Sequence, residues 1–262
     1  MKEDADIVFS NALAIHRNGP NRLHQEKHLH EYYQTSMVSA LMQGVLEGNV
    51  SVGSLLEHGD TGIGTFSGLD GEMIVLDGEI YQTRGKGDAT RAEAETKTPY
   101  AAVTFFVPDV EMEIASPLAK EPFEARLEDS EGSKNLFYAV RIDGVFPYVK
   151  IRNVVRQEPP YKSLLDVVVD QVVNEFRDVK GTMVGFRCPD YASGIGVPGY
   201  HLHFIDEDRA YGGHVLDYTV GPASVALDQT AVLHLELPES QTFSDADIAV
   251  GSSADDIRKA ES

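Results

Sequence analysis

Short runs in which hydrophobic and polar residues alternate recur along the chain, and this pattern predicts a protein rich in β-strands. Between residues 62 and 83, the dipeptides Asp70-Gly71 and Asp77-Gly78 separate strand-like runs in the manner of tight hairpin turns, which predicts an antiparallel meander. Further strands are expected at 99–107, in the run AVRI from Ala139, at 146–155, and in the runs GTMVGFRC, GYHLHFID, HVLDYTV and TAVLHLEL.

Two stretches show helical spacing instead. Met37, Leu41 and Val45 recur at i, i+4 and i+8, with Ser36 available to cap the start and Gly48 to end the run, so a short amphipathic helix is expected. The second stretch, residues 162–176, has the clearest helical spacing in the chain, despite its many β-branched residues. Its apolar positions are Leu164, Leu165, Val168, Val169, Val172, Val173 and Phe176.

These elements predict an α/β protein of the α+β type, with two domains each built on a mixed β-sheet with flanking helices. The charged stretch at residues 125–136 is the expected junction. The predicted organisation is an N-terminal arm over 1–25, an N-terminal domain over 26–130, a C-terminal metal-binding domain over 131–240, and a C-terminal tail over 241–262 that reaches the site.

The composition narrows the class of partner. The 262 residues include 22 Lys and Arg against 42 Asp and Glu, a net charge of −20 that repels phosphate backbones and argues against nucleic acid. The single cysteine, Cys188, excludes a disulfide within the chain and a cysteine-rich metal site. No apolar run approaches the roughly 20 residues of a membrane-spanning helix, and the acidic N-terminus does not resemble a signal peptide, so a cytoplasmic protein is expected.

Histidines provide the strongest candidate chemistry. His201 and His203 lie on an apolar strand, where residues i and i+2 share a face, and His214 opens the strand that returns after a turn. A symmetric hairpin would place His203 opposite His214, so three imidazoles would meet on one face. The pair His28 and His30 lies in a polar stretch without a third ligand nearby, and a solvated loop is the better interpretation there.

Three neutral imidazoles are the ligands of a catalytic zinc site, and they also suit iron, nickel or copper. The alternative is that these histidines are held in a core or spread over a surface strand, and the pattern alone does not decide. Glu207 follows the second pair at a spacing that approaches the cupin metal pattern. Because it lies in the acidic turn Asp206-Glu207-Asp208, we interpret it as solvated and leave it out of the site.

Several long motifs carry a family resemblance. The chain from about Tyr32 to Leu237 resembles the α-acetolactate decarboxylase family, most clearly in the runs ALMQGVLEGN, GIGTFSGLDGEMIVLDGEIYQ, AVRIDGVFPYVKIRNV and GTMVGFRCPDYASGIGVPGYHLHFIDEDRAYGGHVLDY. The resemblance implies a zinc-dependent enzyme of two α/β domains, usually a homodimer. It implies the conversion of 2-acetolactate (2-hydroxy-2-methyl-3-oxobutanoate) to acetoin and carbon dioxide.

The resemblance also implies the residues of the site. The zinc ligands fall on His201, His203 and His214, the three histidines already selected. The other implied site residues are Glu72 of the LDGE motif, Thr65 of the preceding GTF in the substrate pocket, Arg152 of the IRNV motif, and Glu261 in the tail. Without the resemblance, Glu72 would be interpreted as a strand-edge carboxylate and Arg152 as part of a surface basic stripe.

A 2-hydroxy-3-oxo acid can lose carbon dioxide without an organic cofactor, because its C3 ketone accepts the electrons as an enediolate that zinc stabilises. Arg152 would either pair with the substrate carboxylate or enediolate or direct the returning proton, and Glu72 and Glu261 could share a proton. Two alternatives remain: a zinc hydrolase with Glu72 as general base on a zinc-bound water, and a metal-binding sensor module without turnover. The resemblance favours decarboxylation.

Overall fold

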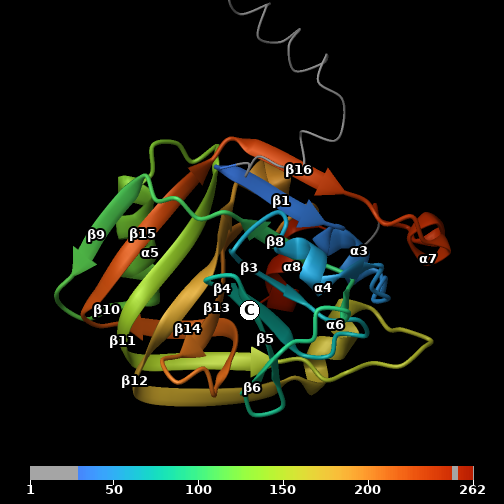
Figure 1. Cartoon of the computed structure of the whole chain (residues 1–262), viewed down its shortest axis with the longest axis horizontal. Coiled ribbons are helices and arrows are strands. Elements are labelled where there is room, and N and C mark those ends of the chain that lie inside the picture. Colours follow the sequence, from blue (N-terminus) through green and yellow to red (C-terminus); the bar gives the residue numbers. More distant parts are fainter. Residues whose placement is uncertain (1–28, 250–252, 262) are drawn as a thin grey trace, which may run out of the picture.

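The computed structural model describes residues 29–249 and 253–261, and most of them belong to two seven-stranded sheets (Figure 1). The first sheet is antiparallel except for the pairing of its first two strands. In spatial order its strands are β16 (Val232–Glu236), β1 (Glu31–Thr35), β8 (Ala101–Thr104), β3 (Thr61–Thr65), β4 (Glu72–Leu76), β5 (Glu79–Arg84) and β6 (Asp88–Arg91).

The second sheet is antiparallel and contains the two longest strands. Its spatial order is β10 (Leu118–Ala119), β14 (Gly212–Val220), β13 (Gly199–Asp206), β12 (Val172–Cys188), β11 (Phe137–Asn153), β15 (Ala223–Thr230) and β9 (Val110–Ile114). Strand β14 pairs with β13 on one side and with the far end of β11 on the other. The four strands from β11 to β14 therefore close on themselves.

Shorter elements complete the described chain. A two-stranded sheet joins β2 (Val50–Ser51) to β7 (Lys97–Thr98). The helices are α3 (Val38–Met42), α4 (Val52–Leu55), α5 (Lys120–Ser130), α6 (Leu164–Val167), α7 (Gln241–Asp245) and α8 (Ala254–Glu261), with single 3₁₀ turns η1 (Val168–Asp170) and η2 (Asp190–Ala192). In the described part of the chain, no helix is long and apolar enough to cross a membrane.

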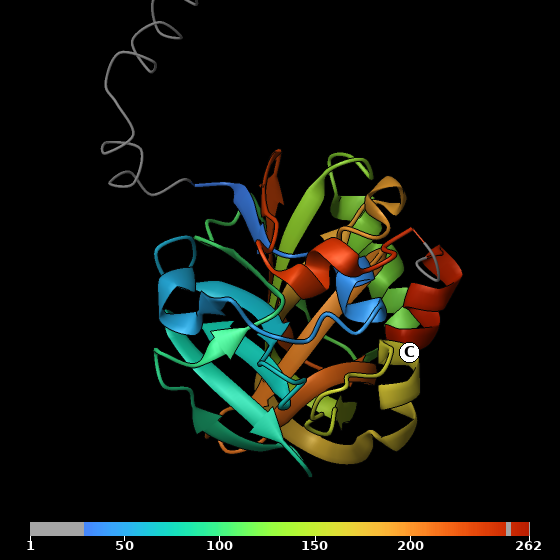
Figure 2. The same cartoon turned by 90° about the vertical axis from the view of Figure 1, so that its right-hand side faces the viewer.

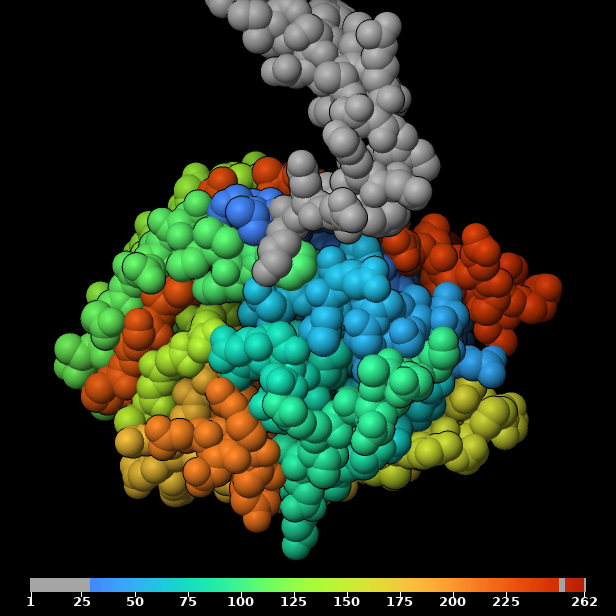
Figure 3. Space-filling view, viewed as in Figure 1, coloured from blue at the N-terminus to red at the C-terminus, as the bar shows by residue number. Residues whose placement is uncertain are grey.

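The two sheets pack against each other through an apolar layer. Ile63 and Ile74 of the first sheet share one buried cluster with Val184, Phe186 and Ile205 of the second. At one end, helices α3, α6 and α8 pack together against the sheets, as the two perpendicular views show (Figures 1 and 2). In the space-filling view, the cyan to teal segment that carries β3 to β6 lies at the centre of the face toward the viewer (Figure 3). The site described below lies between the sheets and this helical end.

The predicted α+β class, dominated by sheets, is confirmed. The sheets exchange strands across residues 130 and 131, because β16 joins the first sheet beside β1 while β9 and β10 join the second. The predicted domain limits stay a prediction, and the N-terminal arm over 1–25 lies outside the described residues. The charged stretch at 125–136 is not an open linker: its first part completes α5, whose Phe123 and Leu127 are buried in the second sheet's core.

The prediction of a helix over 162–176 is wrong beyond its first turns. Helix α6 and the turn η1 end at Asp170, and β12 begins at Val172. The pairing of Val172 and Val173 with β11 overrides the helical spacing, as β-branched side chains favour. The two strands expected at 139–142 and 146–155 form one continuous strand, β11, because β12 pairs along nearly its whole length.

Candidate metal centre

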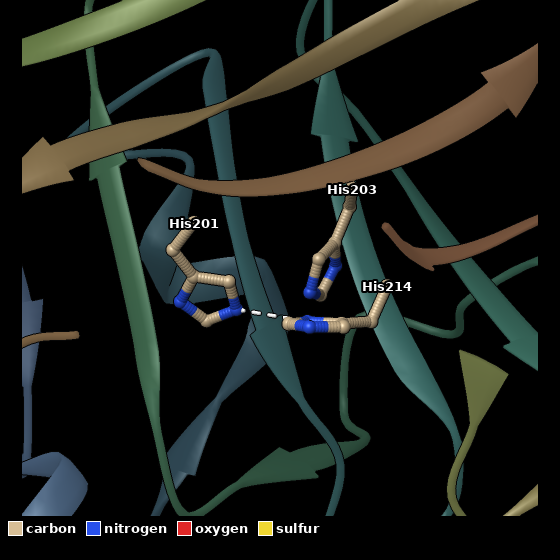
Figure 4. A group of neighbouring side chains, drawn as sticks. All are labelled: His201, His203 and His214. Atoms are coloured by element: carbon tan, nitrogen blue, oxygen red, sulfur yellow. Dashed lines mark hydrogen bonds between the residues drawn. The ribbon is translucent and has the colours of Figure 1, made fainter. Parts of the chain in front are cut away.

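Three histidines meet between the second sheet and helix α8 (Figure 4). His201 and His203 project from the same face of β13, and His203 pairs directly with His214 of β14, as the hairpin symmetry predicts. The ring centroids are 4.9–5.4 Å apart, and one ligand atom from each ring lies within 4.8 Å of the others. All three side chains are buried. The alternative of histidines spread over a surface strand is thereby excluded.

Hydrogen bonds to backbone carbonyls set the tautomers of two of these rings. His203 Nδ1 donates to the oxygen of Met73 at 2.8 Å, and His214 Nε2 donates to the oxygen of Glu261 at 3.0 Å. The free lone pairs are therefore on His203 Nε2 and His214 Nδ1. His203 Nε2 is buried and has no hydrogen-bond partner. Carbonyl partners of this kind orient metal-bound histidines.

The remaining donor completes a set that fits a metal ion. His201 Nε2 lies 3.1 Å from His214 Nδ1, close to the roughly 3.3 Å between ligand nitrogens of a tetrahedral zinc site with bonds of about 2.0–2.1 Å. Burial lowers the pKa of all three imidazoles, to about 3 for His201, and the nearby positive charge of Arg152 lowers them further. At neutral pH the rings are neutral, which is the form that binds a metal.

Two carboxylates face the histidines. Glu72, at the start of β4, places Oε2 at 3.8 Å from His203 Nε2, while its Oε1 is buried without a hydrogen-bond partner. Glu261, at the end of α8, places Oε2 at 3.7 Å from His201 Nε2 and 3.6 Å from His214 Nδ1. Burial raises the pKa of both side chains, to about 7 for Glu72, although Arg152 opposes the rise. Either carboxylate could join the three histidines at a metal ion.

Arg152 connects the sheet to the C-terminal helix. It pairs with His214 across β11 and β14, and the residue is only 3 % exposed, which excludes the interpretation as a surface stripe residue. Nη2 donates to Glu261 Oε2 at 2.8 Å, while Nη1 donates to the oxygen of Ala260 and, at 3.2 Å, to Gln171 Oε1. The Nε atom is buried without a partner. One positive charge thus stands beside the histidines in a site that excludes most water.

The opposite side of the site is apolar. A small cavity of about 30 Å³ lies among these groups. Besides the histidines, Arg152 and the two glutamates, its lining residues are Val38, Leu41, Gly64, Thr65, Leu69, Tyr100, Val154 and Leu164. Thr65, paired with Glu72 across β3 and β4, donates from its hydroxyl to the oxygen of Gly71 at 2.7 Å. No signal in the sequence identifies the apolar lining, because its members come from separate elements without a common pattern.

The structure places the other sequence candidates elsewhere. Glu207 is exposed in the turn between β13 and β14. His30 bonds through Nδ1 to Asp228 at 2.7 Å and lies 3.7 Å from Asp109, so these three form a second, partly exposed group of possible ligands. Its sequence partner His28 lies outside the described residues.

Comparisons with known proteins agree with the motifs. The family model described as alpha-acetolactate decarboxylase matches residues 32–250. A protein named alpha-acetolactate decarboxylase from Methylococcus capsulatus is 41% identical over 93% of this chain and 94% of its own, and one from Methanosarcina mazei is 48% identical over 82% and 75%. The crystal structure of alpha-acetolactate decarboxylase from Bacillus subtilis strain 168 is 42% identical and superposes with a TM-score of 0.86 over 88% of this chain and 99% of that one. The chain therefore belongs to the alpha-acetolactate decarboxylase family of carboxy-lyases, as its motifs predict.

Proposed function

We propose that this protein is a zinc-dependent decarboxylase that converts 2-acetolactate to acetoin and carbon dioxide. The observation that carries the proposal is the convergence of His201, His203 and His214, all buried and neutral, beside the buried guanidinium of Arg152. The names of the related proteins support 2-acetolactate as the substrate. A zinc ion bound by the three histidines would supply Lewis-acid stabilisation of the negative oxygens that develop when carbon dioxide leaves.

Arg152 is the group best suited to hold the carboxylate of the substrate or the charge of the enediolate. Its Nη2 donates a hydrogen bond to the Glu261 carboxylate, so the guanidinium already binds a carboxylate in this structure. The side chain is buried, and a charge in a site of low polarity acts more strongly than in water. A guanidinium is a poor acid, so we assign the returning proton to another group.

Glu72 is the best donor for the proton that returns to C2. In the metal-free protein, burial raises the pKa of its side chain to about 7, so this environment favours a protonated carboxyl group. Its Oε1 has no hydrogen-bond partner in the protein and can therefore reach a ligand. The charge of Glu261 also raises the pKa of Glu72, while the charge of Arg152 lowers it.

A zinc hydrolase is the second candidate. The position of Glu72 near His203, at 3.8 Å, is one that a general base acting on a bound water would also take. The hydrolase would turn over an ester, amide or lactone and leave 2-acetolactate unchanged.

The test is to incubate the purified protein with racemic 2-acetolactate and to follow carbon dioxide and chiral acetoin. The protein should be active as isolated, lose activity after treatment with a chelator, and recover it with added zinc. Turnover of an ester, amide or lactone without any acetoin would instead support the hydrolase. A homodimer and a cytoplasmic location stay predictions, to be tested by light scattering and by cell fractionation.

A further inference from the structure

Leu69 has an unusual backbone conformation for a branched hydrophobic residue. Its φ is +53°, in the left-handed region that favours glycine, asparagine and aspartate. The other described non-glycine residues with positive φ are His30, Ser36, Asp77, Asp178 and Arg209, so Leu69 is the only hydrophobic one. Strained residues of this kind persist only where their surroundings impose the conformation, and they concentrate at functional sites.

Hydrogen bonds on both sides of Leu69 hold the backbone in this left-handed conformation. Gly68 donates from its nitrogen to the oxygen of Leu46 at 2.7 Å and accepts at its oxygen from the nitrogen of Gln157 at 2.6 Å. On the other side, the Asp70 carboxylate takes two hydrogen bonds from Arg84, at 2.8 and 2.6 Å. The backbone carbonyl oxygen of Asp70 also accepts a hydrogen bond from Gln82 Nε2 at 2.6 Å. The turn between β3 and β4 is thus fixed immediately before and after Leu69.

The fixed turn directs the Leu69 side chain into the site. The residue is 2 % exposed, belongs to the buried cluster at the helical end, and lines the cavity together with Val154 and Leu164. Glycine would adopt this φ without strain, so the turn itself does not require a leucine. What the leucine adds is a branched apolar group at the wall of the cavity, three residues before Glu72.

We propose that Leu69 determines specificity by contacting the alkyl group on C2 of the substrate and limiting its length. This inference rests on the proposed function. The carboxylate of a 2-hydroxy-3-oxo acid would pair with Arg152, and its hydroxyl and ketone oxygens would bind the metal held by the three histidines. The alkyl groups are then left for the apolar wall. Leu69 lies three residues before Glu72, and both line the cavity beside the histidines and Arg152. We therefore assign Leu69 to the C2 substituent rather than to the far methyl group of the ketone.

The test compares kcat/KM for three substrates in the full-length zinc enzyme. They are 2-acetolactate, its homologue with ethyl in place of methyl on C2, and its homologue with a propionyl in place of the acetyl group. In Leu69→Ala, kcat/KM for the C2-ethyl substrate relative to 2-acetolactate should rise at least tenfold, since one methylene in an apolar pocket is worth about 10–200-fold. The relative rate for the propionyl substrate should change less than threefold.

The matched control is Leu46→Ala, which removes the same atoms from the same buried cluster but not from the cavity wall. Its substrate ratios should stay within threefold of the wild type. An unchanged ethyl-to-methyl ratio in Leu69→Ala, an equal rise in Leu46→Ala, or a gain for the propionyl substrate alone would overturn the proposal. If the wild type decarboxylates none of the three substrates, the proposed function fails first, and that result is distinct from these.

Leu69→Gly keeps the proposal testable if the alanine variant folds poorly. It should shift the ratio in the same direction. The melting temperature of Leu69→Gly should also be no lower than that of Leu69→Ala, because glycine adopts a positive φ without strain. At positions with an ordinary φ, a glycine variant is less stable than the corresponding alanine variant. A lower melting temperature for Leu69→Gly would show that no strain is held at this turn.

Discussion

Replacing Arg152 with lysine keeps a positive charge in the site but removes the planar fork that joins β11 to helix α8. The guanidinium donates to the Glu261 carboxylate, the Ala260 oxygen and Gln171 Oε1. The single ammonium of a shorter side chain can replace at most part of this set. Losing one or two buried hydrogen bonds from a charged donor, each worth about 1.5–3 kcal/mol, weakens the docking of α8 by roughly 1.5–6 kcal/mol.

A helix of eight residues is not stable in isolation, so α8 depends on this docking, and on the burial of Ile257 and Ala260, to stay folded. Arg152→Lys should therefore increase hydrogen exchange in residues 254–261 while most of the protein exchanges as before. We also expect kcat/KM for 2-acetolactate to fall at least tenfold, a loss of about 1.4 kcal/mol in transition-state stabilisation.

The control for this experiment is Arg91→Lys. Arg91 pairs with Glu79 at 2.6 Å, but its side chain is 65% exposed, so the substitution should leave both hydrogen exchange and kcat/KM nearly unchanged. Near wild-type kinetics in Arg152→Lys would show that the planar fork of Arg152 does not stabilise the transition state. If turnover stayed fast while the configuration of the acetoin became scrambled, Arg152 would direct the proton and the electrostatic role assigned to it would be wrong.

Two further predictions concern the frame of the site and a distant ion pair. A Cβ at Gly185 would lie 2.0 Å from the carbonyl oxygen of His201 on β13, so Gly185→Ala should displace that strand and lower zinc content. A Cβ at Gly78 would meet no atom within 4 Å, so Gly78→Ala should leave zinc content unchanged. The hydrogen bond from His30 to Asp228 raises the pKa of the His30 imidazole. The charged pair therefore stabilises the fold fully below the ordinary histidine pKa. This stabilisation is lost as the pH rises through the raised pKa. Because the His30 side chain is 40% exposed, His30→Ala should lower the free energy of unfolding by about 1 kcal/mol or less. Urea unfolding should show a larger loss of stability at pH 5.5 than at pH 9. An equal or larger loss at pH 9 would contradict this assignment.

The sequence predicted the parts of the fold that depend on local pattern. The dipeptides Asp70-Gly71 and Asp77-Gly78 lie at the turns around β4, and the spacing of His203 and His214 predicted their pairing. The failure at residues 162–176 has a different origin. Its helical spacing is real, but a long strand partner, β11, gives the second half of the stretch a better alternative that only the tertiary structure supplies.

In the candidate site too, the sequence pattern identified some residues and could not identify others. The three histidines follow from the geometry of one hairpin, so spacing could identify them. Arg152 and Glu261 are 109 residues apart, and no local pattern predicts that they form a buried ion pair. Their place beside the histidines came only from the family resemblance. Leu69 had no signal in the sequence, because its importance lies in a backbone conformation that its neighbours impose.

The proposed function requires one metal ion, held by His201, His203 and His214, for turnover. The most direct measurement is to titrate the metal-free protein with zinc while recording bound zinc and acetoin formation together. Activity should rise in proportion to zinc occupancy and reach its maximum at one zinc per chain. His203→Ala should bind little zinc and be inactive, and His30→Ala should behave like the wild type. Full activity without metal, or full zinc occupancy and activity in His203→Ala, would contradict this requirement.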